Sequence, residues 1–144
     1  AKPIAVVTGG AGFIGSHMVD NLLAHGYRVR AVDNLVSGRE SNVAHQAANP
    51  DFSLEQRDVR DLEPGNALFR DACQVFHFAG IGDIVPSIER PAEYMSVNVQ
   101  GTVRVLECAR DANVRKLVYA ASSSCYGLAA TPTCEDHPVA PQYP

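Results

Sequence analysis

A glycine-rich run lies between an apolar segment and a helical pattern near the start of the 144-residue chain. The run is Thr8-Gly9-Gly10-Ala11-Gly12-Phe13-Ile14-Gly15, which matches both G-x-G-x-x-G and G-x-x-G-x-x-G. The segment 4–7 before it is short and β-branched, as expected of a buried strand, and the pattern after it runs through Leu22 and Leu23 to Gly26. This order predicts a strand, a tight turn and a helix whose free N–H groups bind a pyrophosphate.

An acidic residue closes the second apolar segment of the chain. Val29-Arg30-Ala31-Val32 is followed by Asp33, which lies 18 residues beyond Gly15. A carboxylate at this place in a strand–helix–strand unit binds the ribose hydroxyls of a dinucleotide. The turn and Asp33 together predict a dinucleotide site. The simpler alternative is a structural glycine turn with a helix-capping aspartate downstream.

Composition narrows the class of protein. Apolar residues make up 46% and charged residues 19% of the chain, as in one globular domain. The net charge is −4 without a basic run, which argues against a nucleic-acid partner. No apolar stretch approaches the roughly 20 residues of a membrane span. We therefore expect no membrane partner. The first strand candidate begins almost at once, so we also expect no cleavable signal.

The cysteines and histidines show no ligand spacing. The four cysteines form no C-x-x-C pair and predict reduced thiols in a cytoplasmic protein, with a Cys125–Cys134 disulfide as the alternative. The histidines have no mutual ligand spacing, so no metal site is predicted. The cysteines are Cys73, Cys108, Cys125 and Cys134.

Five strand candidates alternate with helical stretches. They cover residues 3–8, 28–33, 52–56, 73–79 and 115–121. The last two are continuously apolar rather than alternating, as parallel strands covered on both faces require. With right-handed crossovers, the alternation predicts an α/β fold. We expect one Rossmann domain over residues 1–144, a doubly wound parallel sheet with strand order 3-2-1-4-5.

Apolar spacing predicts which helix faces pack. Ile14, Met18 and Leu22 recur every four residues and are expected to face the sheet. A second helix should follow Pro91 and end near Asn113, a residue that tolerates a left-handed cap. It carries apolar side chains on one side at Met95, Val99, Val103 and Leu106.

Further motifs follow the glycine turn in a fixed order. They are Asp33-Asn34-Leu35 with Ser37-Gly38, Asp58-Val59-Arg60-Asp61, His77-Phe78-Ala79-Gly80, Asn98-Val99-Gln100-Gly101-Thr102, Ser122-Ser123-Ser124-Cys125-Tyr126-Gly127, and Pro132-Thr133-Cys134-Glu135 with Pro138. Over the whole chain they resemble the extended short-chain dehydrogenase/reductase family. Within it, the chain is similar to the NAD-dependent nucleotide-sugar epimerases and dehydratases.

The resemblance implies an NAD site and a partner for each part of the cofactor. In the family, the first aspartate of the acidic motif, Asp58-Val59-Arg60-Asp61, and the residue after it touch adenine. The segment after the fourth strand, His77-Phe78-Ala79-Gly80, lies along the cofactor. NAD is expected over NADP because Asp33 would repel a 2′-phosphate, for which Arg39 is the nearest partner. The implied cofactor-binding residues are Gly9, Gly12, Phe13, Ile14, Gly15, Asp33, Asn34, Ser37, Gly38, Asp58, Val59, Phe78, Ala79, Gly80 and Asn98.

Even without the family resemblance, the positions of these residues predict that they meet at one ligand. Gly9, Asp33, Asp58, Ala79 and Ser122 fall at or just past predicted strand ends, where open α/β sheets bind ligands. Plainer interpretations remain open for several positions. Asp58 can cap a helix, the serines can be a polar strand edge, and His77 is expected to be a hydrogen-bonded core residue. His17 is expected on the first helix near the turn.

The resemblance implies a catalytic serine, and it shows that the family's general base is absent from the 144 residues. The family's serine or threonine lies four positions before the tyrosine of Tyr-Gly, which gives Ser122, with Ser123 and Ser124 adjacent. Its hydroxyl would relay a proton and bind the developing ketone oxygen. The family's Tyr-x-x-x-Lys pair is absent from the 144 residues, and neither Tyr126 nor Tyr143 replaces it. We therefore expect a fragment that lacks the later strands and the substrate lobe.

The expected function follows from these motifs. In the full-length enzyme, NAD would oxidise the sugar C4 hydroxyl and return hydride to the opposite face, as in a UDP-sugar 4-epimerase that acts as a homodimer. The stretch 84–88 is similar to epimerases of UDP-N-acetylhexosamines and UDP-hexuronates. Alternatives are a nucleotide-sugar dehydratase or reductase and, of another class, a non-catalytic dinucleotide-binding module. The 144 residues alone are expected to be inactive.

Overall fold

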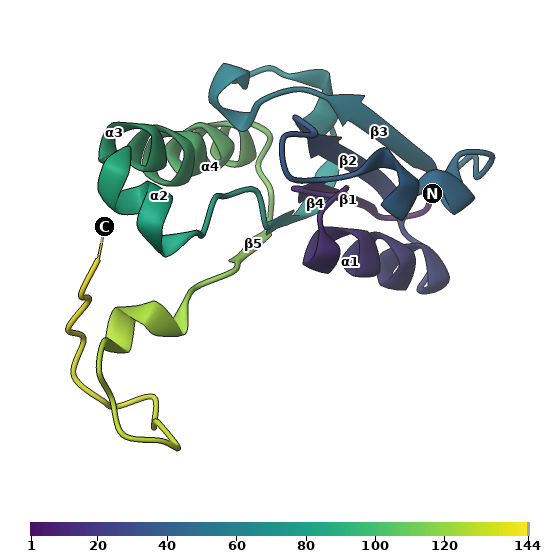
Figure 1. The fold of residues 1–144 in the computed structure, drawn as a ribbon. Coiled ribbons are helices and arrows are strands. Elements are labelled where there is room, and N and C mark those ends of the chain that lie inside the picture. Colours follow the sequence, from purple (N-terminus) through teal and green to yellow (C-terminus); the bar gives the residue numbers. More distant parts are fainter. Residues whose placement is uncertain (144) are drawn as a thin grey trace.

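The computed structural model describes residues 1–143 and is built around one parallel sheet of five strands (Figure 1). The strands are β1 Ile4–Thr8, β2 Arg28–Asp33, β3 Phe52–Gln56, β4 Ala72–His77 and β5 Lys116–Tyr119. Their order is β3-β2-β1-β4-β5, and each neighbouring pair is parallel. This confirms the predicted α/β class and strand order.

Two strands end earlier than the apolar pattern predicted. β4 ends at His77 instead of residue 79, and β5 ends at Tyr119 instead of residue 121. The Phe78 N–H still bonds to the Thr8 carbonyl at 3.1 Å, but the next N–H, of Ala79, donates to the Thr8 side chain at 3.2 Å. The chain leaves the sheet here because a side-chain hydroxyl replaces the next strand partner.

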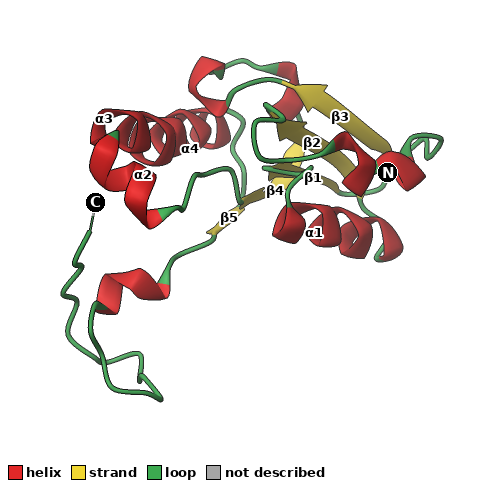
Figure 2. Ribbon diagram, viewed as in Figure 1, coloured by secondary structure: helices red, strands yellow, loops and turns green. Residues whose placement is uncertain are grey.

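The helices cover both faces of the sheet (Figure 2). They are α1 Phe13–Ala24, α2 Ile84–Glu89, α3 Pro91–Tyr94 and α4 Gly101–Asp111. On one face, Val19 and Leu22 of α1 pack on Val7 and Val29. On the other, α4 contributes to a second core cluster together with Val6 and Val75. This two-sided cover is why the central strands are apolar on both faces.

The buried face of α1 differs from the predicted one. Leu22 is buried and Met18 packs partly buried against the same cluster, as expected, but Ile14 is 56% exposed and Val19 is buried in the core instead. The prediction for Ile14 was wrong because Gly15, the next residue, sits against the carbonyl of Gly9 and orients the first turn of the helix. Close packing of a glycine on the turn decides the face, and apolar spacing does not report it.

The helical stretch after Pro91 is interrupted. α3 passes into a π-helical stretch, Met95–Gln100, which then continues as α4. α4 ends close to the predicted place, and Asn113 has the expected left-handed φ of 54°. The predicted apolar side is 47–56% exposed at its four positions. These are Met95, Val99, Val103 and Leu106.

The segment 120–143, after β5, runs away from the sheet as an extended arm (Figure 1). It holds one short helical turn, Ser123–Tyr126, and is otherwise irregular, as expected from Gly127 onward. The arm's internal contacts include the ring of Tyr126 on His137 and the bond from Ala140 N–H to the Cys125 carbonyl at 2.9 Å. All four cysteines are free. In residues 1–143 no helix is long and apolar enough to cross a membrane.

Candidate cofactor site

The glycine turn has tighter steric limits at Gly9 and Gly15 than at Gly12. Gly9 has φ +66°, and a Cβ there would lie 2.7 Å from the main-chain nitrogen of Ala79. A Cβ at Gly15 would lie 2.0 Å from the Gly9 carbonyl oxygen. At Gly12 the nearest atom to a Cβ is the same oxygen at 3.1 Å, so Gly12 is the least constrained of the three by the fold itself. The turn itself therefore requires glycine at Gly9 and Gly15.

The N-terminus of α1 follows this turn directly. Gly12 caps the helix without a side-chain bond, and the first turn contains no acidic residue. The first N–H groups of a helix have no partner within it and favour an anion. The side chains of Phe13 and Ile14 are exposed, so any contact they make with a phosphate is expected from their main chain. This arrangement fits the predicted pyrophosphate cradle.

Asp33 is held rigidly at the end of β2. Its side chain is buried, and its carboxylate accepts from the Ala11 N–H at 3.0 Å and from the Leu35 N–H at 2.8 Å. The loop after β2 closes on it at Gly38, where a Cβ would lie 2.7 Å from both carboxylate oxygens. Gly38 therefore has to lack a side chain for Asp33 to keep this position.

Asp58 follows β3, the strand next to that of Asp33, and caps the turn Val59–Asp61. Its Oδ1 accepts from the Arg60 N–H at 2.9 Å, so Asp58 is a cap, but of a short turn that begins at Val59 and not of a helix beginning near Asp61. Side-chain hydrogen bonds from the Arg60 guanidinium hold the pKa of Asp58 far below its usual range. The Asn34 amide donates to Asp58 Oδ2 at 2.9 Å and so joins the loop after β2 to the loop after β3. Contact of Asp58 with adenine stays a prediction.

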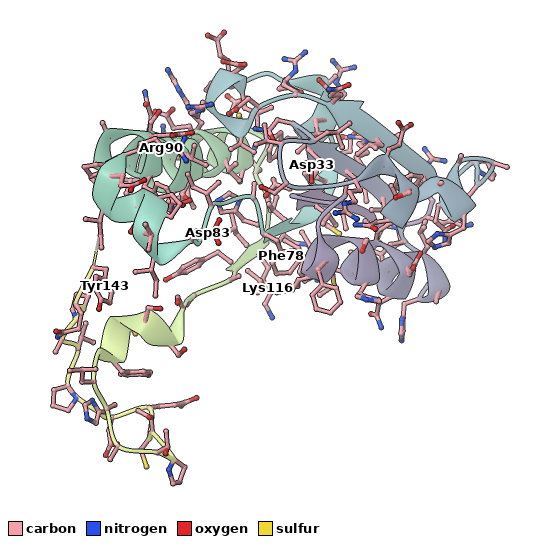
Figure 3. The ribbon with its side chains drawn as sticks, in the orientation of Figure 1. Asp33, Phe78, Asp83, Arg90, Lys116 and Tyr143 are labelled. Carbon is pink, nitrogen blue, oxygen red and sulfur yellow. The ribbon has the colours of Figure 1, made fainter. Side chains whose placement is uncertain are left out.

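One cavity connects these groups at the carboxyl ends of the strands, and Figure 3 shows Asp33 and Phe78 at this edge. Eleven of the predicted residues line it: Gly9, Gly12, Asp33, Asn34, Ser37, Gly38, Asp58, Val59, Phe78, Ala79 and Gly80. Phe13, Ile14, Gly15 and Asn98 do not line it. The structure adds six further lining residues, namely Val36, Arg57, Arg60, Ile81, Glu93 and Val97.

Some of these six additional residues could have been predicted from the sequence and others could not. Arg60 lies within the acidic motif and Arg57 directly precedes it, so the sequence already places both close to Asp58. Glu93 and Val97 come from α3 and the π-helical stretch. No local pattern marks them, because only the crossover after β4 carries these residues over the cavity.

Asn98 acts on the cavity indirectly. Its side-chain amide donates to the Ile81 carbonyl at 2.8 Å, and its Oδ1 accepts from the Ile81 N–H at 2.9 Å. The same oxygen would lie 3.1 Å from a Cβ at Gly80. Asn98 therefore fixes the loop after β4, which lines the cavity, and the π-helical stretch presents it there.

His77 is a buried core histidine, as expected. Thr102 Oγ1 donates to the Asn98 carbonyl at 2.5 Å and therefore accepts from His77 Nε2 at 2.9 Å. His77 Nδ1 then accepts from the Thr8 hydroxyl at 2.6 Å. This network assigns a neutral Nε2–H imidazole that ties the end of β1 to α4.

Protonation of His77 should destabilise the fold. Burial lowers its pKa below the ordinary value of 6.5, so the unfolded chain takes up the proton first. The stability from neutral His77 is present above pH 6.5 and is lost as the pH falls toward the lowered value. We expect the free energy of unfolding to fall by up to about 1.4 kcal/mol per pH unit in this window. Urea unfolding at pH 7 and 5.5 measures it, and His77→Gln should show a shallower pH slope. Equal slopes would contradict the assignment.

The serine motif is not brought to the cavity. Ser122, Ser123 and Ser124 are exposed on the arm, and Ser122 Oγ accepts from the Ser124 N–H at 3.1 Å. Tyr143 lies on the arm away from Asp33 and Phe78 (Figure 3). The predicted convergence is therefore confirmed for Gly9, Asp33, Asp58 and Ala79 and not for Ser122. In residues 1–143 no three His, Cys, Asp or Glu side chains are grouped for a metal.

Comparison with known proteins agrees with this arrangement. The chain is 45% identical over 143 residues to a UDP-glucose 4-epimerase of Mycolicibacterium smegmatis, covering 96% of this chain and 45% of that protein. Its structure is similar to a UDP-N-acetylglucosamine 4-epimerase from Methanobrevibacter ruminantium, with a TM-score of 0.88 and 29% identity, over 99% of this chain and 45% of that one.

A dTDP-glucose 4,6-dehydratase from Streptomyces venezuelae, solved with NAD bound, is similar with a TM-score of 0.86 and 34% identity. That likeness covers 97% of this chain and 46% of the other. The chain thus spans about half the length of the relatives that it matches. Since the sequence matches the NAD dependent epimerase/dehydratase family over residues 5–144, the chain belongs to that family.

Proposed function

We propose that this chain is the NAD-binding part of a nucleotide-sugar 4-epimerase. The observation that carries the proposal is one cavity in which the glycine turn, the Asp33 carboxylate and Asp58 meet at the carboxyl ends of the strands. Open α/β sheets bind nucleotides at this edge. The family of the chain and its epimerase relatives support the reaction class.

The residues present fit NAD. Gly12 leaves room for a phosphate that a side chain would exclude, and the N-terminus of α1 offers N–H groups to it. Asp33 offers a fixed acceptor for ribose hydroxyls. When bound, NAD supplies the hydride acceptor and donor for the sugar C4 position. Phe78, Ala79 and Gly80 give the cavity a mostly apolar wall along which the cofactor would lie.

Ser122 is the proposed proton-handling group of this chain. A serine hydroxyl can take the proton that leaves the sugar C4 oxygen while it passes its own proton to the general base, and it can then donate to the ketone oxygen. Since Ser122 stands exposed beyond β5, its role requires the arm to lie against a bound sugar. Ser123 and Ser124 are the adjacent candidates. The general base would come from a Tyr-x-x-x-Lys segment outside the 144 residues.

Turnover tests this assignment. We expect the 144-residue chain to leave UDP-glucose and UDP-N-acetylglucosamine unchanged, and a longer protein containing a Tyr-x-x-x-Lys segment to epimerise one of them. Ser122→Ala in the longer protein should lower kcat by about 100-fold or more while NAD affinity stays the same. Product formation by the 144 residues alone would contradict the proposal. A fully active Ser122→Ala enzyme would move the role to Ser123, Ser124 or water.

The product separates epimerase from dehydratase. The dehydratase from Streptomyces venezuelae is the observation that favours this second candidate. An epimerase returns a sugar of unchanged mass, whereas a 4,6-dehydratase releases water and leaves a keto sugar. Mass spectrometry of the product from the longer protein therefore decides between them. NAD binding without any turnover would favour a non-catalytic module.

We also propose that the full-length protein is a homodimer in the reducing cytoplasm. The π-helical stretch and α4 share an apolar side that is about half exposed at four positions, and such a patch marks an interaction surface. They are Met95, Val99, Val103 and Leu106. The four free cysteines suit a reducing compartment. Sedimentation of the full-length protein checks the dimer.

A further inference from the structure

The carbonyl of Ala11, inside the glycine turn, is held by a side chain 31 positions further along the chain. The Asn42 amide nitrogen Nδ2 donates to this oxygen at 2.8 Å, and the Arg39 N–H donates to it at 3.0 Å. A carbonyl oxygen has two lone pairs, so both are in use. Ala11 is fully buried, and these two bonds fix the direction in which its carbonyl points.

The two donors come from one anchored turn. The main-chain N–H of Asn42 donates to the Arg39 carbonyl at 2.9 Å and closes the short helical turn Glu40–Asn42. The Asn42 residue is exposed, but Val43, which follows it, is 1% exposed and lies in the same core cluster as Val19 of α1. Because Val43 ties this turn to α1, the amide of Asn42 stays within reach of the glycine turn.

The held carbonyl belongs to the peptide unit that joins Ala11 to Gly12. The N–H of this unit donates to the Gly9 carbonyl at 3.0 Å, and Gly9 and Gly12 both line the cavity. A rotation of the unit by half a turn would exchange the two directions and bring the Ala11 oxygen to the place of the N–H. Gly12 tolerates such a rotation because a glycine adopts either sign of φ. A carbonyl oxygen there would face a phosphate with the negative end of its dipole, where N–H groups favour the anion.

We propose that Asn42 is a positioning residue for the pyrophosphate of the dinucleotide, because its amide keeps the Ala11 carbonyl turned away from the cavity. The inference rests on the proposed NAD site and assigns Asn42 no direct contact with the cofactor. The Ala11 N–H, which donates to Asp33 Oδ2 at 3.0 Å, belongs to the preceding peptide unit. Loss of the Asn42 amide should therefore weaken the binding of phosphate and leave the ribose acceptor in place.

Calorimetry with NAD and with adenosine, which has the ribose but no phosphate, tests the proposal. Asn42→Leu removes the donor at nearly the same side-chain size and the same charge. We expect its affinity for NAD to fall about 5-fold, the effect of one neutral hydrogen bond, and its affinity for adenosine, measured by competition, to stay the same. Asn42→Gln keeps an amide donor on a longer stem, so its affinity for NAD should lie between those of the unaltered protein and Asn42→Leu.

Asn49→Leu makes a matched control. Asn49 lies in the same connection between β2 and β3, but its amide donates to Gln46 Oε1 at 2.9 Å and makes no bond to the glycine turn. It also accepts from the Asp51 N–H at 3.0 Å, so its loss affects the local fold. In Asn49→Leu the ratio of the affinities for NAD and adenosine should stay as in the unaltered protein.

The outcomes separate this inference from the proposed function. No NAD binding by the unaltered protein would remove both. Unchanged NAD affinity in Asn42→Leu would overturn only the inference. An equal loss of affinity for NAD and adenosine in that variant would show a merely structural role and also overturn it, as would an Asn42→Gln protein that binds NAD no better than Asn42→Leu. If the leucine variant unfolds, Asn42→Ala lacks the same donor and adds no bulk, and the ratio in that variant decides.

Discussion

Gly15→Ala is expected to lower the free energy of unfolding by about 3 kcal/mol or more, at the upper end of the cost of overpacking. The added Cβ would lie 2.0 Å from the carbonyl oxygen and 2.8 Å from the carbonyl carbon of Gly9. Main-chain atoms cannot rotate away, and Gly9 is tied to β2 by the bond from its N–H to the Val32 carbonyl at 2.8 Å. The helix or the turn therefore has to move.

Urea unfolding of Gly15→Ala beside Gly82→Ala makes the comparison. A Cβ at Gly82 meets nothing within 4 Å, so that variant should stay within about 0.5 kcal/mol of the unaltered protein. Similar unfolding midpoints for the two variants would contradict the close contact at Gly15. Loss of stability in both would point to a general effect of removing glycines.

Gly12→Val is expected to abolish most NAD binding while the fold survives. The nearest atom to a Cβ at this position is 3.1 Å away, so the protein can adjust, but the branched methyl groups would occupy the cavity that Gly12 lines. We expect the affinity for NAD to fall about 100-fold, equivalent to an overpacking cost of roughly 3 kcal/mol. Calorimetry measures the affinity, and circular dichroism checks the fold.

Gly12→Ala gives a graded control for the valine variant. Its single methyl should weaken NAD binding less than the branched side chain does. Normal binding of NAD by Gly12→Val would mean that the glycine run serves the fold alone, and the cavity would need another occupant.

Strand patterns predicted the sheet because burial on both faces leaves a continuous apolar signal. β2 and β3 match their predicted bounds, and the sheet order is the predicted one. The end of β4 was misplaced because Phe78 and Ala79 are as apolar as the strand before them, although they line the cavity. An apolar pattern shows that residues are shielded from water, and it does not distinguish a strand from the wall of a cavity.

The site was predictable where one short motif supplies a whole group. The turn and Asp33 each lie in a contiguous segment whose spacing reflects the geometry. Arg60 lies inside the acidic motif, yet its pairing with Asp58 was not predictable from the sequence, because side chains two residues apart meet only in a particular turn. The position of Glu93 at the cavity depends on the crossover after β4, which spans many residues.

If the cavity holds NAD through Asp33, calorimetry of the purified protein should distinguish NAD from NADP. The Asp33 carboxylate is held by the N–H groups of Ala11 and Leu35, so it cannot turn away from a 2′-phosphate. We predict tighter binding of NAD than of NADP, and a loss of about 10-fold or more in NAD affinity in Asp33→Ala, the effect of one or more hydrogen bonds to a charged group. Equal or tighter binding of NADP, or unchanged NAD affinity in Asp33→Ala, would contradict the account.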